Sequence, residues 1–514
     1  MRDFSNEVFT NYGDEKEHRQ MLAALQRVES QLGQAYPLLI GGKATQTEQQ
    51  IVSLNPSNKD QVIGYVSKAD PALAERAMQA ALAAFDGWKR KSFPERARYL
   101  LKAAAIMRRT KHELSAWMCY EAGKTWAEAD GDTAEAIDFL EFYAREAIRL
   151  GEVQPIVKIA GEDNEQHYVP IGVGIVIPPW NFPLAILTGM TSAAVVAGNT
   201  VIVKPASSTP VIAAKLMEIF QAAGVPAGVI NYLPGNGAEI GDFLTQHPQT
   251  RFISFTGSRE VGIHIYELAA KVQPGQLWLK RVVAEMGGKD AIVVDKDADL
   301  EEAAQAIVSS AFNFAGQKCS ACSRAILFED VYDQVAARIV ELTNAMRVGP
   351  GMEEESAIGP VVDESAYRKI LDYIEVGKTE GKLLAGGGKA DGNGYYIQPT
   401  VFGDVLPEAR IAQEEIFGPV LALIKAKDYK HAIAIANGTD YGLTGSVFTR
   451  NRDHLEYARQ EFHVGNLYFN RKCTGALVGV HPFGGFKMSG TDSKAGGRDY
   501  LLLFSQAKAV AEKL

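Results

Sequence analysis

The feature that most constrains the fold of this chain is a regular alternation of short apolar runs with amphipathic segments between residues 171 and 272. The apolar runs end at glycine, proline or polar residues, as buried strands do, and the segments between them have helical spacing. The expected strands are 173–181, 200–206, 228–234 and 251–257, and the expected helices are 184–199, 209–224, 238–246 and 259–272. This alternation predicts βαβ units, and therefore a parallel sheet with helices on both faces.

A second block of the same kind follows, up to about residue 470. Its clearest parts are apolar runs at 290–295 and 323–330 and helical segments at 300–313 and 331–346. A chain of 514 residues is also too long for one compact core. We therefore expect two or three domains of the α/β class.

Other segments lie outside these two blocks. Helices are expected at 16–36, 71–89 and 95–122, where small and apolar residues recur every three or four positions. Residues 152–170 are expected to form a hairpin, and residues 500–514 contain an apolar run with no obvious core of its own. A hairpin and an apolar tail would suit subunit contacts, although a tail folded onto its own domain fits equally well.

Composition excludes several classes of protein. No run approaches the roughly 18 apolar residues of a membrane span, and the N-terminal residues are acidic and polar, unlike a signal peptide. The formal net charge of −9 argues against nucleic acid as the main partner. Four cysteines in 514 residues make no disulfide framework, so the expected compartment is the reduced cytoplasm.

A nucleotide is the ligand that such a sheet commonly binds, at the carboxyl ends of its strands. The usual GxGxxG fingerprint after the first strand is absent. In "FTGSREVG", however, Gly257 and Ser258 follow a strand and open a helix, where backbone N–H groups can hold a pyrophosphate. Lys204 lies just past another strand end and would place a cation at the same edge, or it is simply a solvated lysine.

Two cysteines in "FNFAGQKCSACSR", Cys319 and Cys322, form a C-x-x-C pattern. A zinc half-site would need a second pair of ligands, and Cys119 and Cys473 are isolated in the sequence, so no metal is expected. A thioredoxin-like pair would open a helix after a strand, whereas here a helix is expected before the motif and a strand after it. A buried structural cysteine and a catalytic nucleophile are the remaining interpretations.

Two further residues favour a nucleophile. In "AEMGGKDA", Glu285 precedes two glycines, and a carboxylate in an apolar turn can have a raised pKa and act as a base. In "PWNFP", Asn181 carries a side-chain amide that can donate to an oxyanion at a strand end. A thiol, a base, an amide donor and a dinucleotide site together suggest oxidation of a carbonyl through a thioester.

Eight motifs in order resemble the NAD(P)-dependent aldehyde dehydrogenase superfamily over nearly the whole chain. They are "PWNFP", "VKPASSTP", "FTGSREVG", "EMGGK", "GQKCSACSR", "EEIFGPV", "NR" and "PFGGFKMSG". The resemblance implies that Cys319 is the nucleophile, that Asn181 and the Cys319 N–H form the oxyanion hole, and that Glu285 is the general base. It also implies cofactor-binding roles for Trp180, Lys204, Ser207, Gly257, Ser258, Glu415 and Phe417.

The implied fold is aldehyde dehydrogenase-like, with a Rossmann-type cofactor domain, an α/β catalytic domain and a small bridging element for oligomerisation. The expected domains are residues 1–151 and 171–284 for the cofactor, 285–490 for catalysis, and 152–170 with 491–514 for oligomerisation. The resemblance further implies a homodimer or larger homo-oligomer.

"GQKCSACSR" and "KCTGALVGVHPFGGFKMSGT" resemble the branch of this superfamily that oxidises L-glutamate γ-semialdehyde, the 1-pyrroline-5-carboxylate dehydrogenases of proline and arginine breakdown. The substrate-binding residues that this resemblance implies are Glu135, Phe182, Ser320, Gly475, Ala476 and Phe483. Among them, Gly475 and Ala476 would bind the α-carboxylate through backbone N–H groups. Glu135 would bind the ammonium, or it is an exposed helix carboxylate. A branch acting on another small semialdehyde is the alternative.

NAD is the expected cofactor, with NADP tolerated. Strongly NAD-selective relatives often carry Glu three residues after the strand-end lysine, where it would repel a 2′-phosphate. Here that position is Ser207.

Overall fold

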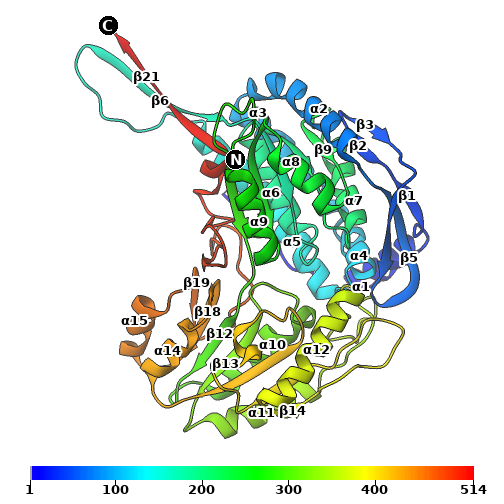
Figure 1. Ribbon diagram of the computed structural model, residues 1–514, viewed down its shortest axis with the longest axis vertical. Coiled ribbons are helices and arrows are strands. Elements are labelled where there is room, and N and C mark those ends of the chain that lie inside the picture. The colour runs from blue at the N-terminus through cyan, green and yellow to red at the C-terminus, as the bar shows by residue number, and fades with distance from the viewer. Residues whose placement is uncertain (1–2) are drawn as a thin grey trace.

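The computed structural model describes residues 3–514 and has two lobes, each built on a seven-stranded sheet, and one projecting arm (Figure 1). In the first lobe the sheet order is β11-β10-β7-β8-β9-β2-β3, and the five strands from β11 to β9 are parallel. Their bounds are β2 (Leu38–Ile40), β3 (Lys43–Thr45), β7 (Val173–Ile177), β8 (Thr200–Val203), β9 (Ile230–Tyr232), β10 (Thr250–Thr256) and β11 (Arg281–Glu285). The predicted parallel sheet is confirmed.

Helices cover both faces of this sheet (Figure 1). The helices of the first lobe are α1 (Glu15–Glu29), α2 (Pro71–Lys89), α3 (Phe93–Arg109), α4 (Lys111–Glu121), α5 (Trp126–Leu150), α6 (Ala185–Val196), α7 (Pro210–Ala222), α8 (Asp242–Gln246) and α9 (Arg259–Ala270), with a π-helical turn η1 (Gly237–Gly241) before α8. A small sheet of β1 (Gln34–Tyr36), β5 (Asn58–Ser67) and β4 (Gln50–Asn55) completes the lobe.

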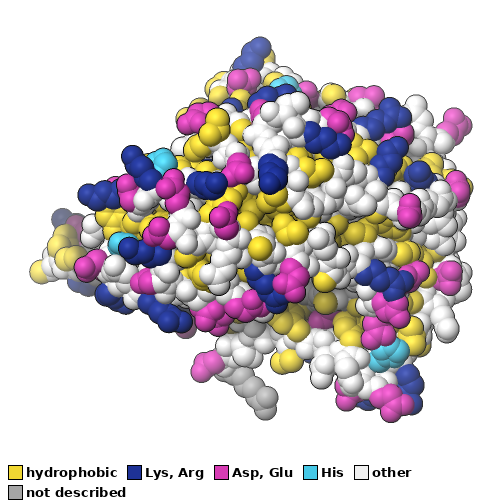
Figure 2. Space-filling view, turned by 90° about the horizontal axis from the view of Figure 1, so that it is seen from below, with side chains coloured by type: hydrophobic (Ala, Val, Ile, Leu, Met, Phe, Trp, Pro, Cys, Tyr) yellow, Lys and Arg dark blue, Asp and Glu magenta, His cyan; other side chains and the backbone are white. Residues whose placement is uncertain are grey.

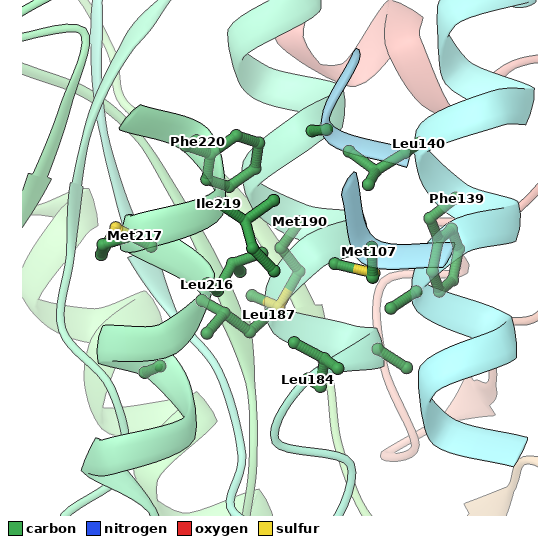
Figure 3. Packing of buried hydrophobic residues seen from close by; sticks show 14 of the residues in the cluster. Met107, Phe139, Leu140, Leu184, Leu187, Met190, Leu216, Met217, Ile219 and Phe220 are labelled. Atoms are coloured by element: carbon green, nitrogen blue, oxygen red, sulfur yellow. The ribbon is translucent and has the colours of Figure 1, made fainter. Parts of the chain in front are cut away.

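The core of the first lobe lies where α3, α5, α6 and α7 pack together (Figure 3). Phe139 of α5 and Met190 of α6 belong to this core, and both also line the cavity described below. Burial of such side chains contributes roughly 1.5–3 kcal/mol each. One wall of the cavity is therefore part of a packed interior.

The second lobe has a sheet in the order β14-β15-β16-β13-β12-β18-β19, parallel except between β14 and β15. Its strands are β12 (Asp290–Val294), β13 (Cys322–Phe328), β14 (Lys382–Ala385), β15 (Thr400–Gly403), β16 (Val420–Ala426), β18 (Thr444–Phe448) and β19 (Asn466–Phe469). Its helices are α10 (Leu300–Phe312), η2 (Asn313–Gly316), α11 (Tyr332–Asn344), α12 (Glu364–Glu380), α13 (Arg410–Gln413), α14 (Tyr429–Asn437) and α15 (Arg452–Glu461). The short β17 (Tyr441–Gly442) pairs with β20 (Phe486–Lys487).

The arm consists of β6 (Glu162–Pro170) and β21 (Ser505–Lys513), paired antiparallel along their full length. The prediction of a hairpin within residues 152–170 is therefore wrong, because the partner strand comes from the C-terminus. The preceding turn η3 (Tyr500–Phe504) packs into the first-lobe core. The tail thus does both things that its sequence allowed: its apolar part folds back, and its last strand projects (Figure 1).

Two helix predictions need correction. The helix expected at 16–36 ends at Glu29, and the chain turns through Gly33, whose φ is +79°, into β1. The helix expected at 95–122 is two helices separated at Thr110, where φ is −108° and ψ is 19°. The Thr110 hydroxyl donates to the Ile106 carbonyl at 3.2 Å, so it caps α3 instead of continuing it.

Candidate active site

Four neighbouring strands of the first sheet end at one edge, and each is followed by a predicted site residue. β11 ends at Glu285, β10 is followed by Gly257, β7 leads to Asn181, and β8 is followed by Lys204. The chain order reverses between β7 and β10, because β8 and β9 lie to one side and β10 and β11 to the other. Such a reversal opens a crevice at the carboxyl ends of the strands, where α/β sheets bind their ligands.

A cavity of about 960 Å³, including its open mouth, lies beside this edge. It brings together the predicted nucleophile, base and substrate-binding residues from both lobes. Those of its lining residues that the sequence predicted are Cys319, Glu285, Glu135, Phe182, Ser320, Gly475, Ala476 and Phe483. The remaining wall is mainly apolar and includes Phe139, Tyr143, Met190, Val478 and Tyr500.

Cys319 lies in a tight loop between α10 and β13. The loop begins with Phe314 and Ala315, two non-glycine residues with left-handed φ values of 56° and 51°. The Glu128 carboxylate accepts a hydrogen bond from the Phe314 N–H and holds this strained turn. Burial raises the pKa of the Cys319 thiol, so in this state the side chain is a thiol at neutral pH.

Gln317 secures the same loop from within. Its side-chain amide donates to the Phe314 and Pro360 carbonyls, and its carbonyl oxygen accepts from the Val362 N–H at 2.9 Å. The Asn181 amide donates to the Gln317 backbone carbonyl at 3.0 Å. Asn181 is therefore held against the loop of Cys319, where the predicted oxyanion donor would need to lie.

Glu285, which the sequence predicted to be the general base, is buried. Its Oε1 accepts hydrogen bonds from the Ser493 hydroxyl and N–H, whereas its Oε2 has no partner within residues 3–514. Burial raises the pKa of Glu285 to about 7, although the Ser493 bonds lower it. A carboxylate with a free oxygen and a pKa near neutrality can exchange protons with the groups that share its cavity.

Glu135 lies on α5 and lines the cavity, so it is not an exposed helix carboxylate. Burial, then the carboxylates of Asp132 and Asp138, raise its pKa to about 8, whereas Lys124 and Lys318 lower it. A cationic group of a ligand beside Glu135 would stabilise the ionised form. Phe182 and Phe483 also line the cavity, so apolar surface is available to a short aliphatic chain.

The predicted cofactor residues lie around the crevice. Lys204 is buried, burial lowers its pKa to about 8, and the only hydrogen bond of its ammonium within residues 3–514 is a long one, 3.4 Å, to the Pro205 carbonyl. Ser258 caps α9, and the Gly257 N–H donates to the Glu285 carbonyl at 3.0 Å. Ser207 is exposed in the loop after β8.

Two more of these residues come from elsewhere in the chain. Glu415 accepts a hydrogen bond from the Gly288 N–H at 2.9 Å, and any side chain at position 287 would collide with its carboxylate. Phe417 has a left-handed φ of 59° and packs edge-on against Trp180, with ring centroids 5.5 Å apart. The loop before β16 thus contacts the segment between β11 and β12 through Glu415 and the loop after β7 through Phe417.

Cys322 is the first residue of β13 and is buried, with its thiol directed at the Arg324 carbonyl at 3.5 Å. The C-x-x-C spacing therefore does not place the two thiols in one site. The thiol of Cys473, isolated in the sequence, is also buried and donates to the Ser320 carbonyl at 3.5 Å. Within residues 3–514 no group of three or more His, Cys, Asp or Glu side chains could hold a metal ion, and no helix is long and apolar enough to cross a membrane.

Three residues of the site were missed from the sequence: Ser493, Lys124 and Arg471. Ser493 contacts Glu285 from 208 residues further along the chain. Lys124 is buried between the rings of Phe182 and Phe314, at 4.1 Å and 4.0 Å from their centroids. None of the three is a residue to which the motifs assign a role, although the pair "NR" occurs at 451–452 and again at 470–471.

Comparison with known proteins agrees with this geometry. The aldehyde dehydrogenase family profile matches residues 43–510. The chain is 62% identical over 512 residues to the 1-pyrroline-5-carboxylate dehydrogenase of Geobacillus thermodenitrificans, covering 100% of this chain and 99% of that protein. It is 59% identical over 509 residues to the Bacillus subtilis protein of that name, covering 99% of each.

A solved structure of the 1-pyrroline-5-carboxylate dehydrogenase from Thermus with bound NAD is similar over 100% of both chains, with a TM-score of 0.99 and 55% sequence identity. The resemblance found in the eight motifs is thus confirmed. The chain belongs to the aldehyde dehydrogenase family.

Proposed function

We propose that this protein oxidises L-glutamate γ-semialdehyde, which is in equilibrium with 1-pyrroline-5-carboxylate, to L-glutamate, as a step of proline and arginine degradation. The observation that carries the proposal is the composition of one cavity. It contains a thiol and a base, and its wall also includes Glu135 and the Gly475–Ala476 loop, which suit an ammonium and a carboxylate. Relatives of that name at about 60% identity support the same substrate.

NAD is the proposed cofactor, and the residues present fit it. The buried Lys204 ammonium has three N–H donors and one long hydrogen bond, and the Gly288 N–H bonds one of the two Glu415 oxygens. Both side chains can therefore hydrogen-bond ribose hydroxyls. Gly257 and Ser258 at the start of α9 would hold the pyrophosphate. Trp180 and Phe417 would border the nicotinamide. When bound, NAD supplies the acceptor for the hydride that leaves the substrate carbon.

Cys319 starts the reaction by adding to the aldehyde carbon, and its proton must leave because burial keeps the thiol protonated. Glu285 shares the cavity and can accept this proton. The Asn181 amide and the Cys319 N–H then stabilise the oxyanion of the thiohemiacetal. After oxidation, a thioester remains on Cys319. Once Glu285 has released the thiol proton to solvent, its ionised carboxylate takes a proton from the water that releases glutamate.

Substrate recognition is proposed for residues around the same cavity. Glu135 would bind the ammonium, and the N–H groups of Gly475 and Ala476 would bind the α-carboxylate. Phe182 and Phe483 would flank the aliphatic chain, and the Ser320 hydroxyl would complete the polar end. All of these residues line the cavity.

Appearance of reduced cofactor with NAD and glutamate semialdehyde tests this function. Wild type and Cys322→Ala should be active, whereas Cys319→Ala should show no turnover. Cys322 is the matched control, because it is a nearby thiol that packs in β13. Full activity of Cys319→Ala, or a much higher kcat/KM for other aldehydes, would refute the proposal.

We infer in addition that the protein works as a homodimer or larger homo-oligomer in the cytoplasm. A two-stranded ribbon is only marginally stable alone in water, and the β6–β21 arm projects from the body (Figure 1). A second copy that covers the arm would stabilise it. Basic and acidic side chains are interspersed on the face seen in Figure 2, which suits a small-molecule enzyme better than one that binds nucleic acid.

A further inference from the structure

The loop proposed to bind the substrate carboxylate is supported from behind by a single guanidinium. Arg471 lies two residues beyond β19, and one of its terminal nitrogens donates to the Thr474 carbonyl at 2.8 Å and to the Gly475 carbonyl at 3.1 Å. The guanidinium carbon lies over the ring of Tyr468, 4.4 Å from the ring centroid. Its Nε donates to the Lys472 carbonyl at 3.3 Å, and its other terminal nitrogen lies 3.4 Å from His481 Nε2. Within residues 3–514 no carboxylate lies at ion-pair distance of the guanidinium, so its nearest polar partners are loop carbonyls.

The contact with Arg471 also determines the direction in which the N–H groups of Gly475 and Ala476 point. In a trans peptide, a carbonyl and the N–H of the next residue point in opposite directions. With the carbonyls of Thr474 and Gly475 directed at Arg471, the N–H groups of Gly475 and Ala476 point away from it. Gly475 has a left-handed φ of +77°, which lets two successive N–H groups share one side.

These two N–H groups are available to a ligand. Gly475 and Ala476 both line the cavity. Within the described part of the chain, neither N–H donates a hydrogen bond, whereas the next one, of Leu477, donates to His481 Nδ1 at 3.2 Å. An anion in the cavity would satisfy both.

We propose that Arg471 is a positioning residue that sets the preference for substrates with an α-carboxylate, by holding the Gly475 and Ala476 N–H groups toward the cavity. This inference rests on the function proposed above and deepens it. Arg471 acts through the loop and does not contact the reacting atoms. Its loss should therefore weaken binding of the carboxylate without changing the chemistry at Cys319.

Three aldehydes and three variants test the proposal. Glutamate semialdehyde carries both charged groups, 5-oxopentanoate keeps the carboxylate and lacks the amine, and 4-aminobutanal keeps the amine and lacks the carboxylate. Arg471→Met removes the guanidinium, and Arg471→Lys keeps a charge without the planar fork. Arg459→Met is the matched control, since Arg459 also stacks on a ring, that of Phe469, but contacts no loop carbonyl.

In Arg471→Met, KM for the two carboxylate substrates should rise roughly tenfold or more, because bonds to a charged group are lost, with kcat nearly unchanged. The kcat/KM for 4-aminobutanal should stay within about twofold of wild type, since no carboxylate bond is at stake. Arg471→Lys should behave like Arg471→Met, and Arg459→Met like wild type. The Lys variant also preserves the test if the Met variant fails to fold.

The proposal is overturned if Arg471→Met loses kcat/KM equally on all three aldehydes, or if its KM values are unchanged. It is also overturned if Arg471→Lys has the kinetic constants of wild type, because charge alone would then be sufficient. Failure of the proposed function looks different. In that case the wild-type protein itself would not prefer glutamate semialdehyde over 4-aminobutanal.

Discussion

The side-chain amide of Asn181 donates a 3.0 Å hydrogen bond to the backbone carbonyl of Gln317, two residues before Cys319. The two residues belong to different lobes, one in the loop after β7 and the other in the loop before β13. The bond therefore holds Asn181, the proposed oxyanion donor, close to the loop of Cys319, the proposed nucleophile. Because an amide has two N–H donors, one can hold the loop while the other faces an oxyanion.

Asn181→Ala should lower kcat by about a hundredfold to a thousandfold, because one oxyanion donor is lost in a buried site. KM for NAD should change little, since the change lies in the oxyanion hole. Steady-state kinetics of Asn181→Ala and Asn181→Asp measure this, and the Asp variant keeps the size while losing the donor. An Asp variant with wild-type kcat would show that shape, not donation, matters at this position.

Activity should fall as pH falls through about 7, because Glu285, the proposed base, must be ionised to accept a proton and its pKa is about 7. Glu285→Gln should slow both the first release of reduced cofactor and the later turnover, since Glu285 is proposed to accept the Cys319 proton before hydride transfer and a water proton after it. Stopped-flow absorbance would follow both phases between about pH 5.5 and 9, a range that extends roughly two pH units to either side of the pKa of Glu285.

Ser493→Ala is the matched variant for this pH dependence. The hydroxyl of Ser493 donates to Glu285 and lowers its pKa, so its removal should move the pH–rate profile to higher pH. The plateau rate at high pH should be retained. An unshifted profile would mean that another group controls the observed titration.

The alternation of strands and helices in the first lobe could be predicted because buried parallel strands are continuous apolar runs. β7, β8 and β9 are buried along nearly their whole length. The split at Thr110 could not, since neither proline nor glycine interrupts the amphipathic pattern there. The pairing of β6 with β21 could not be predicted either, because the two strands lie more than 300 residues apart in the sequence. The arm also has no buried face, so no apolar pattern indicates which strands pair.

The site shows the same division. Strand ends place Glu285, Asn181 and Lys204 at one edge, so their proximity could be argued from the sequence. Lys124 could not be found in this way, since a lysine at the end of a helical pattern is usually solvated. Its burial depends on rings from two distant loops, which only the folded chain brings together.

Lys124 and Asp132 form a buried ion pair, with Nζ and Oδ2 3.3 Å apart and both side chains at most 1% exposed. Lys124→Met should destabilise the protein by about 3–5 kcal/mol, because Asp132 is left as an unpaired buried charge. The double variant Lys124→Met/Asp132→Asn should recover much of this loss, as neither charge remains. Thermal unfolding of both single variants and the double variant gives the coupling. Additive shifts would show that the pair is not coupled.

Ser207→Glu should reduce the use of NADP while leaving NAD almost unaffected. Ser207 is exposed, three residues beyond Lys204, in the loop that follows β8. A carboxylate there would face the 2′-phosphate of NADP, and like charges at such distances repel by about 1 kcal/mol or more. We expect kcat/KM with NADP to fall about tenfold and that with NAD to change less than about threefold.

Ser207→Gln adds the same bulk without charge and should leave both cofactors usable. The NADP defect should also weaken as salt is raised, because exposed charges are screened. Equal losses with both cofactors, or the same defect in the Gln variant, would point to crowding of the loop and would contradict the electrostatic explanation.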